Sequence, residues 1–152
     1  MPARILIIDP NPSSRILLRT KLDPQFQDVS VTEGAHHGIA MLRVFRPHLV
    51  LLSLGNDEAQ TENAIRSIRS VPAGLDVALI AIGDISQSQG KISLLRLGAD
   101  AVFPSDVAQE KLAGHIHQLL RRRTNFHQSF TKVQDSLPWA MSEAKSEFSA
   151  KK

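Results

Sequence analysis

An uninterrupted aliphatic run, Leu49-Val50-Leu51-Leu52, constrains the fold of this chain more than any other feature. Four consecutive aliphatic residues leave a strand without a polar face, so other elements must cover both of its faces. This pattern is typical of a central strand in a parallel sheet with helices on both sides. In such sheets the chemistry lies just beyond the carboxyl ends of the strands. Ser53 stands at that position and is therefore the first candidate site residue.

The same strand pattern recurs along the chain and alternates with helical patterns. Strands are predicted at residues 3–8, 29–32, 49–53, 77–82 and 101–103. Asn11-Pro12 pairs a capping residue with a proline, which indicates a helix start, and Gly98 indicates a helix end. Five β-α repeats with short connections predict an α/β fold, a parallel five-stranded sheet with helices on both faces.

Each predicted helix carries apolar residues that we expect to face the core. In the first helix these are Ile16, Leu17 and Leu22. In the helix that Gly98 terminates they are Ile92, Leu95 and Leu97. The other expected inward positions are Ile39, Leu42, Phe45, Ala64, Ile65 and Ile68.

Composition excludes several classes of protein. The chain has no cysteine, which excludes disulfides and thiol chemistry, and no run of about 18 apolar residues. We therefore expect a cytoplasmic protein without a membrane span. The net charge of +3 is uneven: residues 1–119 carry 11 Lys or Arg and 12 Asp or Glu, and residues 120–152 carry 7 and 3. The basic character belongs to the tail and does not favour a nucleic-acid surface on the whole domain.

Short motifs at the strand ends carry a resemblance to a known family. Asp9 follows the first predicted strand, Arg46-Pro47-His48-Leu49 leads into the third, and Arg96-Leu97-Gly98-Ala99-Asp100 precedes the fifth. With these motifs, residues 3 to about 122 resemble the receiver domain of bacterial response regulators, the CheY-like module of two-component signalling. The resemblance implies a flavodoxin-like (βα)5 fold, doubly wound, with strand order 2-1-3-4-5.

The resemblance also identifies positions where this chain departs from an active receiver. That family uses an acidic pair after strand 1, a phospho-accepting Asp after strand 3, a Thr or Ser after strand 4 and a Lys before Pro after strand 5. The corresponding positions here are Asp9, Pro10, Ser53, Gly83 and Ser105. If the last loop is one residue short, Phe103 before Pro104 takes the final position, and the family's aromatic switch position corresponds to Val102.

These replacements remove most of the chemistry that the resemblance implies. Magnesium prefers carboxylate and phosphate oxygens in octahedral geometry, and Asp9 is the one carboxylate left for the cleft. A serine hydroxyl such as that of Ser53 is a weak nucleophile without an adjacent base. We therefore expect a non-catalytic, phosphorylation-independent pseudo-receiver that is not an enzyme and holds no cofactor or metal. Its expected role is that of a protein-protein interaction or scaffold module in bacterial signalling.

One alternative keeps the phosphoryl chemistry. An atypical response regulator could still be phosphorylated, or bind a metal, near Asp9, Ser53 or Asp57, with Glu58 and Asp84 as further loop carboxylates. The simpler interpretation of Asp57, Glu58 and Asp84 is that they are solvated loop carboxylates. Two pairs of histidines could suggest a metal site: His36 with His37, and His115 with His117. Side chains one or two residues apart on a helix point in different directions, so we expect these histidines to be surface residues rather than metal ligands.

The last predicted helix carries an apolar seam that extends beyond the receiver-like region. Its members step by four and three residues: Leu112, Ile116, Leu119, Arg123, Phe126, Phe130, Val133 and Leu137. The seam predicts an extended C-terminal helix. It also divides the chain into two parts: a receiver-like domain at residues 1–122, and a helical extension with a basic tail at residues 123–152. A protruding helix that pairs with a protein partner or a second copy, as in a homodimer, is the preferred reading. A helix that folds back on its own domain and a frayed tail remain open.

The arginine run 121–123 suggests a second alternative, a nucleic-acid binder working through the basic tail. The chain has neither a turn-helix unit nor a basic stripe to accompany the run, and cations near the end of a helix are a common solvated arrangement. We therefore expect protein partners rather than nucleic acid.

Overall fold

The computed structural model describes residues 3–22, 25–53, 57–84 and 88–136, with the backbone alone at 88–89 and 123–136. The strands are β1 (Arg4–Ile8), β2 (Asp28–Thr32), β3 (Leu49–Leu52), β4 (Ala78–Ile82) and β5 (Ala101–Phe103). The helices are α1 (Pro12–Leu22), α2 (Ala35–Val44), α3 (Glu58–Ser70), the 3-10 turn η1 (Pro72–Gly74), α4 (Ser88–Leu97) and α5 (Gln109–Ser136). The chain divides into two compact units, residues 1–116, which hold the sheet, and residues 117–152.

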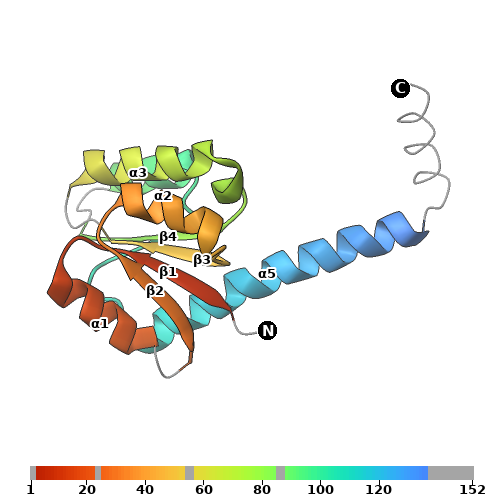
Figure 1. Ribbon diagram of the computed structural model, residues 1–152, viewed down its shortest axis with the longest axis horizontal. Helices are drawn as coiled ribbons and strands as arrows, with labels where there is room; N and C mark the ends of the chain where they lie inside the picture. Colours follow the sequence, from red (N-terminus) through yellow and green to blue (C-terminus); the bar gives the residue numbers. More distant parts are fainter. Residues whose placement is uncertain (1–2, 23–24, 54–56, 85–87, 137–152) are drawn as a thin grey trace. The chain divides into compact units, whose positions relative to one another are not determined.

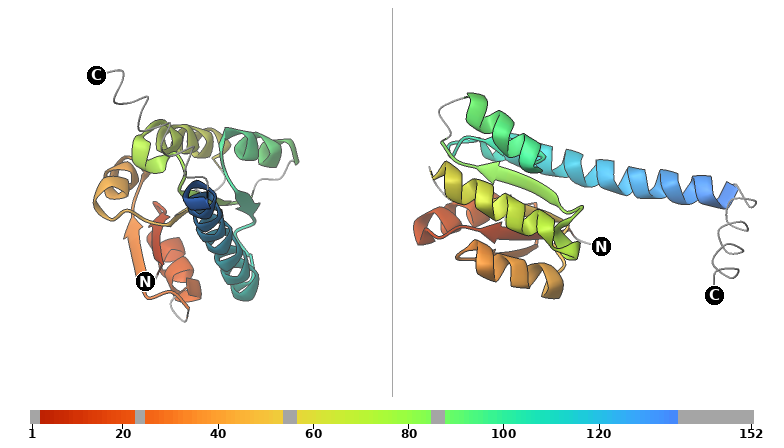
Figure 2. Two further views of the ribbon diagram at one scale, coloured as in Figure 1. Left: turned by 90° about the vertical axis from the view of Figure 1, so that its right-hand side faces the viewer. Right: turned by 90° about the horizontal axis from the view of Figure 1, so that it is seen from above.

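The five strands form one parallel sheet in the order β2-β1-β3-β4-β5, which confirms the predicted flavodoxin-like topology. Helices cover both faces: α1 and the first turns of α5 lie on one side, and α2, α3 and α4 on the other (Figures 1 and 2). In the described part of the chain no helix is both long and apolar enough to cross a membrane.

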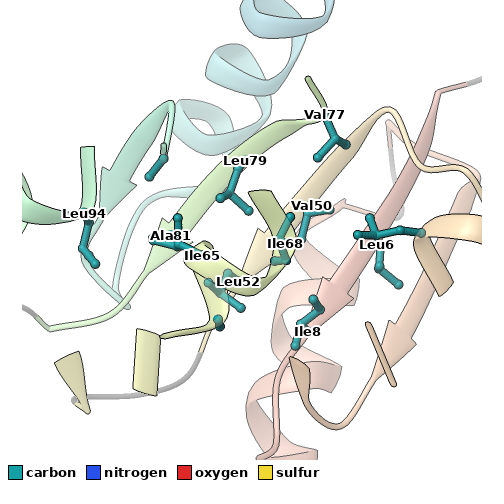
Figure 3. Close-up of a cluster of buried hydrophobic side chains, with 13 residues drawn as sticks. Leu6, Ile8, Val50, Leu52, Ile65, Ile68, Val77, Leu79, Ala81 and Leu94 are labelled. Carbon is teal, nitrogen blue, oxygen red and sulfur yellow. The ribbon is translucent and has the colours of Figure 1, made fainter. Parts of the chain in front are cut away.

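The core lies on both faces of β1, β3 and β4, as the aliphatic run predicted. Every residue of β3 is fully buried. Because successive side chains of a strand alternate between faces, Val50 and Leu52 pack under α2 and α3 while Leu49 and Leu51 face the other layer. Figure 3 shows the cluster on the first of these faces, where Leu6 and Leu79 meet Ile65 and Ile68 of α3. Each fully buried aliphatic side chain contributes about 1.5–3 kcal/mol of transfer free energy.

Two of the predicted helix stripes are wrong in part: Leu22 is buried and Leu97 packs against the core cluster as expected, but the other predicted members are exposed. In α1 the buried residues are Leu18 and Leu22, whereas Ile16 and Leu17 are 67% and 63% exposed. Three consecutive aliphatic residues at 100° steps cannot all face inward, and the pair four residues apart is the one that meets the sheet. In α4 the buried residue is Leu94, while Ile92 and Leu95 are each 46% exposed.

Helix ends follow the predicted capping chemistry. The side-chain oxygen of Asn11 accepts the backbone N–H groups of Ser13 (2.9 Å) and Ser14 (3.3 Å) at the start of α1. Gly98 follows α4 with φ of 126°, the left-handed conformation in which glycine is favoured at a helix end.

Arg69, near the end of α3, organises two connections at the amino edge of the sheet. Its guanidinium donates to the carbonyl oxygens of Gly98 (2.6 and 3.1 Å), Gly74 (2.9 Å) and Val77 (2.7 Å). It also contacts Asp100 at 3.5 Å, and the same carboxylate oxygen accepts the N–H of Leu79 (2.8 Å). One charged side chain thereby satisfies carbonyl groups of the segments leading into β4 and β5, and hydrogen bonds to a charged group are the stronger kind.

Gly74 should tolerate no side chain. A Cβ built there would lie 1.9 Å from the carbonyl oxygen of Ile68. We expect Gly74→Ala to lower the free energy of unfolding by about 1–3 kcal/mol, because backbone must move to relieve the clash. The matched control is Gly114→Ala in α5, which has open space around the new methyl and should stabilise by up to about 1 kcal/mol. Urea denaturation of the three proteins measures both effects, and equal stability of Gly74→Ala and the parent would contradict the packing.

The ring of His48 should make stability depend on pH. Its Nδ1 accepts the N–H of Arg4 at 2.9 Å, which requires the neutral ring, and burial, followed by the charge of Arg4, lowers the pKa of His48 below 6.5. The unfolded chain therefore binds the proton first, so stability is full above pH 6.5 and declines as the pH falls from there toward the folded-state pKa. The loss is modest because the ring keeps solvent contact. We expect His48→Asn to flatten this slope in denaturation curves between pH 7.5 and 5; an unchanged slope would assign it to other groups.

Candidate functional site at the carboxyl edge of the sheet

The sequence-predicted site residues gather at the carboxyl edge of the sheet. Asp9 directly follows β1 and Ser53 directly follows β3, and these strands are neighbours with Ile8 paired to Leu52. The N–H of Ser53 continues the ladder by donating to the carbonyl oxygen of Ile8 at 2.9 Å. Gly83 follows β4, and its N–H donates to the carbonyl oxygen of Phe103 at 3.0 Å. Parallel strands thus deliver all these positions to one edge.

Asp9 is the distinctive group of this edge. Its side chain is 2% exposed, and Oδ1 accepts the N–H of Asn11 at 2.9 Å across Pro10. Oδ2 is the one buried side-chain polar atom in the described residues that has no hydrogen-bond partner. Buried polar atoms are nearly always paired, because leaving one unpaired forfeits its hydration. Asp9 is therefore the residue at this edge whose burial calls for an explanation.

Ser53 lies beside this carboxylate in the ladder and is 7% exposed. Among the described residues its hydroxyl makes no hydrogen bond. Pro10 is exposed and offers neither an N–H nor a polar side chain. Ser53, which the resemblance aligns with the acceptor position of an active receiver, is thus a small neutral side chain.

Ser105 and Asp84 form a link that sequence reasoning missed. Asp84 Oδ1 accepts both the hydroxyl (2.8 Å) and the backbone N–H (3.3 Å) of Ser105, which joins the loop after β4 to the loop after β5. The two residues are 21 positions apart, so no local sequence pattern predicts the contact. Asp84 is one of the loop carboxylates of the relocated-metal alternative, and its Oδ1 is engaged by both of these hydrogen bonds.

The other loop carboxylates also have structural roles or lie apart. Asp57 is the N-cap of α3, where its side chain accepts the N–H of Gln60 at 3.0 Å, and Glu58 lies exposed in the first turn. No group of three or more His, Cys, Asp or Glu that could hold a metal ion occurs within the residues described by the structure.

Phe103, the alternative for the last position, is a core residue. It is 8% exposed, its ring meets that of His115 edge to face at 5.1 Å, and Lys111 Nζ lies 5.9 Å from the ring centroid. Val102 is half-buried and packs against the core cluster. On α2, His36 and His37 are exposed, with ring centroids 5.9 Å apart. The next residue with a polar side chain after β5 is thus Ser105.

The predicted seam begins in the core and continues on an unbroken helix. Leu112, Ile116 and Leu119 are buried. Helix α5 runs on through residue 122 to Ser136, so the predicted helical extension is present in the backbone. The seam members Arg123, Phe126, Phe130 and Val133 lie in the stretch described by backbone alone, and Leu137 falls outside the described residues.

Comparison with known proteins finds similarity in sequence to response regulators. The chain is 28% identical over 124 residues to the response regulator MprA of Mycolicibacterium vanbaalenii, covering 82% of this chain and 53% of MprA. The chain thus spans about half the length of this curated relative. No family model matches the chain.

Solved structures show the same fold. A CheY-like receiver domain protein from Methanospirillum hungatei superposes with a TM-score of 0.71 at 18% identity, covering 82% of this chain and 98% of that one. The receiver domain of the sensor histidine kinase PA1611 from Pseudomonas aeruginosa, which has a magnesium ion in its active-site cleft, superposes with a TM-score of 0.69 at 16% identity. It covers 79% of this chain and 98% of that one. The chain is thus similar in sequence to response regulators and has the fold of solved receiver domains.

Proposed function

We propose that this receiver domain works without phosphorylation, as a protein-interaction module in two-component signalling, and transfers no phosphoryl group. The observation that carries the proposal is the composition of the carboxyl edge. The phospho-acceptor position after β3 holds Ser53, and the carboxylate at this edge that is buried beside it is Asp9. Reversible acyl-phosphate formation needs a carboxylate at the acceptor position, and a serine does not supply one.

The residues present do not fit the magnesium ion that receiver domains of this fold use. Magnesium demands near-octahedral oxygen coordination, usually with one or two carboxylates and the phosphoryl group. Asp9 has one oxygen free of hydrogen bonds, Pro10 supplies no ligand, and Ser53 supplies a neutral hydroxyl. A single carboxylate oxygen and a hydroxyl make a weak donor set for this ion.

The residue after β5 offers no compensation. Where an active receiver places a lysine to pair with phosphoryl oxygens, Ser105 donates its hydroxyl to Asp84. Lys111, the cation near this end of α5, lies over the ring of Phe103. Gly83 stands where an active receiver has a Thr or Ser, and it has no hydroxyl that could move toward a phosphoryl group. Both the pairing charge and the reporting hydroxyl of the phosphorylation response are therefore missing from the positions that matter.

An interaction role is supported by apolar side chains that the fold leaves at the surface. Ile92 and Leu95 of α4 are each 46% exposed, and Ile16 and Leu17 of α1 are more than 60% exposed. Ile92 and Leu95 are three residues apart and therefore share a face of α4, and an exposed apolar face is typical of surfaces that bind other proteins. The proposal assigns recognition to α4 and to the seam of α5, with residues 1–122 as the receiver part, residues 123–152 as the extension, and a homodimer through α5 as one outcome.

A second candidate, an atypical receiver that still binds a metal or a phosphoryl group near Asp9, is favoured by one observation. Asp9 Oδ2 is buried without a partner among the described residues, and a cation at that point would remove the cost. The two candidates differ in what magnesium does to this edge.

An amide NMR titration with magnesium and then beryllofluoride, an acyl-phosphate mimic, separates them. We expect no saturable shift of the Asp9, Ser53 and Gly83 resonances at millimolar ligand. The double variant Pro10→Asp/Ser53→Asp restores a carboxylate cluster and should bind magnesium under the same conditions, which controls for the edge being accessible. Saturable shifts in the parent protein that extend to Val102 would establish the second candidate instead.

The cost of burying Asp9 gives a further prediction. We expect Asp9→Asn to raise the free energy of unfolding by about 1 kcal/mol, because an unpaired amide costs less to bury than an unpaired carboxylate and the acceptor for Asn11 is kept. Asp9→Leu should be less stable than Asp9→Asn because the Asn11 N–H loses its acceptor. The control is Asp57→Asn, an exposed cap that asparagine replaces with little change. A destabilised Asp9→Asn would indicate that Oδ2 has a favourable partner in solution.

A further inference from the structure

An open groove of about 850 Å³ lies at the amino edge of the sheet, opposite the receiver-type positions. It is bounded by the end of α2, by the connection into β3 and by η1, and α2 packs against η1. Its lining residues are Leu42, Arg43, Arg46, Pro47, Val71, Pro72 and Ala73. None of the residues used by the phosphorylation chemistry of receivers takes part, so this groove stands independently of the function proposed above.

The walls of the groove are apolar and held in place. Leu42 is fully buried, and Val71 packs against the core cluster. Pro47 and Pro72 have restricted backbones. Behind η1, Arg69 binds the carbonyl of Gly74 at 2.9 Å. A groove formed by fixed elements does not have to be ordered by its ligand, which favours binding.

Two arginines supply all the charge of the lining. Arg43 and Arg46 are exposed, no acidic residue lines the groove, and within the described residues neither guanidinium has a hydrogen-bond or ion-pair partner. This contrasts with Arg69, whose guanidinium is bound by several carbonyl groups. Asp76, the acidic residue nearest in sequence to any lining residue, lies beyond η1 and is not part of the lining.

Arg46 enters the groove from a fixed and strained turn. It is the one residue other than glycine with positive φ in the described chain, at 51°. Its carbonyl oxygen and that of Phe45 accept from Arg4 Nε at 2.9 and 3.0 Å, which holds the turn in place. Glycine or asparagine would adopt this backbone with less strain, and a long cation stands there instead.

We propose that this groove binds an acidic, apolar-rich peptide segment of a partner protein. The apolar walls accept aliphatic or aromatic side chains, and Arg43 and Arg46 pair with carboxylates. An extended ligand is favoured over a compact one because exposed apolar residues flank the lining residues in sequence. Val44, next to Arg43, is 82% exposed, and Leu75, just after η1, is 64% exposed.

Fluorescence anisotropy with a labelled ten-residue peptide that alternates Glu with Leu and Phe tests the proposal. We expect saturable binding to the full chain that weakens as salt is raised. Arg43→Gln/Arg46→Asn should weaken it at least tenfold, with asparagine chosen because it tolerates positive φ. Ala73→Trp, which fills the groove from an exposed position, should abolish binding. The matched control is Arg66→Gln, an exposed arginine of α3 outside the lining, which should bind as the parent does.

Several results would overturn the proposal. These are no binding of the peptide at millimolar protein, equal binding by the double variant, and equal binding of a peptide with Lys in place of Glu. A competition experiment gives a further outcome. If citrate displaces the labelled peptide at the same concentration as unlabelled peptide does, the groove is only a small-anion site and a peptide partner is rejected. Urea denaturation of each variant confirms that a loss of binding is not a loss of fold.

Discussion

Burial of both faces of the central strands is the constraint on which this structure depends. Because β1, β3 and β4 consist of aliphatic residues on both sides, neither face of the sheet can meet water, and helices must cover each. A parallel sheet covered on both faces leaves only its two edges for polar chemistry. The carboxyl edge holds Asp9, Ser53 and the Asp84–Ser105 link, and the amino edge holds the Arg69 network and the arginine-lined groove.

Much of this architecture follows from local patterns in the sequence. Aliphatic runs marked the strands, Asn11-Pro12 and Gly98 marked helix ends, and the strand ends placed Asp9 and Ser53 on one edge. The helix faces were predicted less well. In α1, three adjacent aliphatic residues gave no way to tell Leu18 from Ile16 or Leu17, since only packing against the sheet selects among them.

The contacts that shape the two edges could not be read from the sequence. Asp84 meets Ser105 across 21 residues, and Arg69 meets Gly98 across 29, so each pair depends on how separate β-α units come together. The groove has the same origin, because its lining comes from the end of α2 and from η1, which are brought together only by the packing of those units.

The Asp84–Ser105 hydrogen bond has a consequence for how such a domain could be controlled. It joins the loop after β4 to the loop after β5 by side chains already present, without any added group. A domain that works without phosphorylation, as proposed above, has no phosphoryl group to switch it between two states. Its output in a cell would then be set by how much of the protein is made and degraded, and by the concentration of its partners, in the manner of a stoichiometric component.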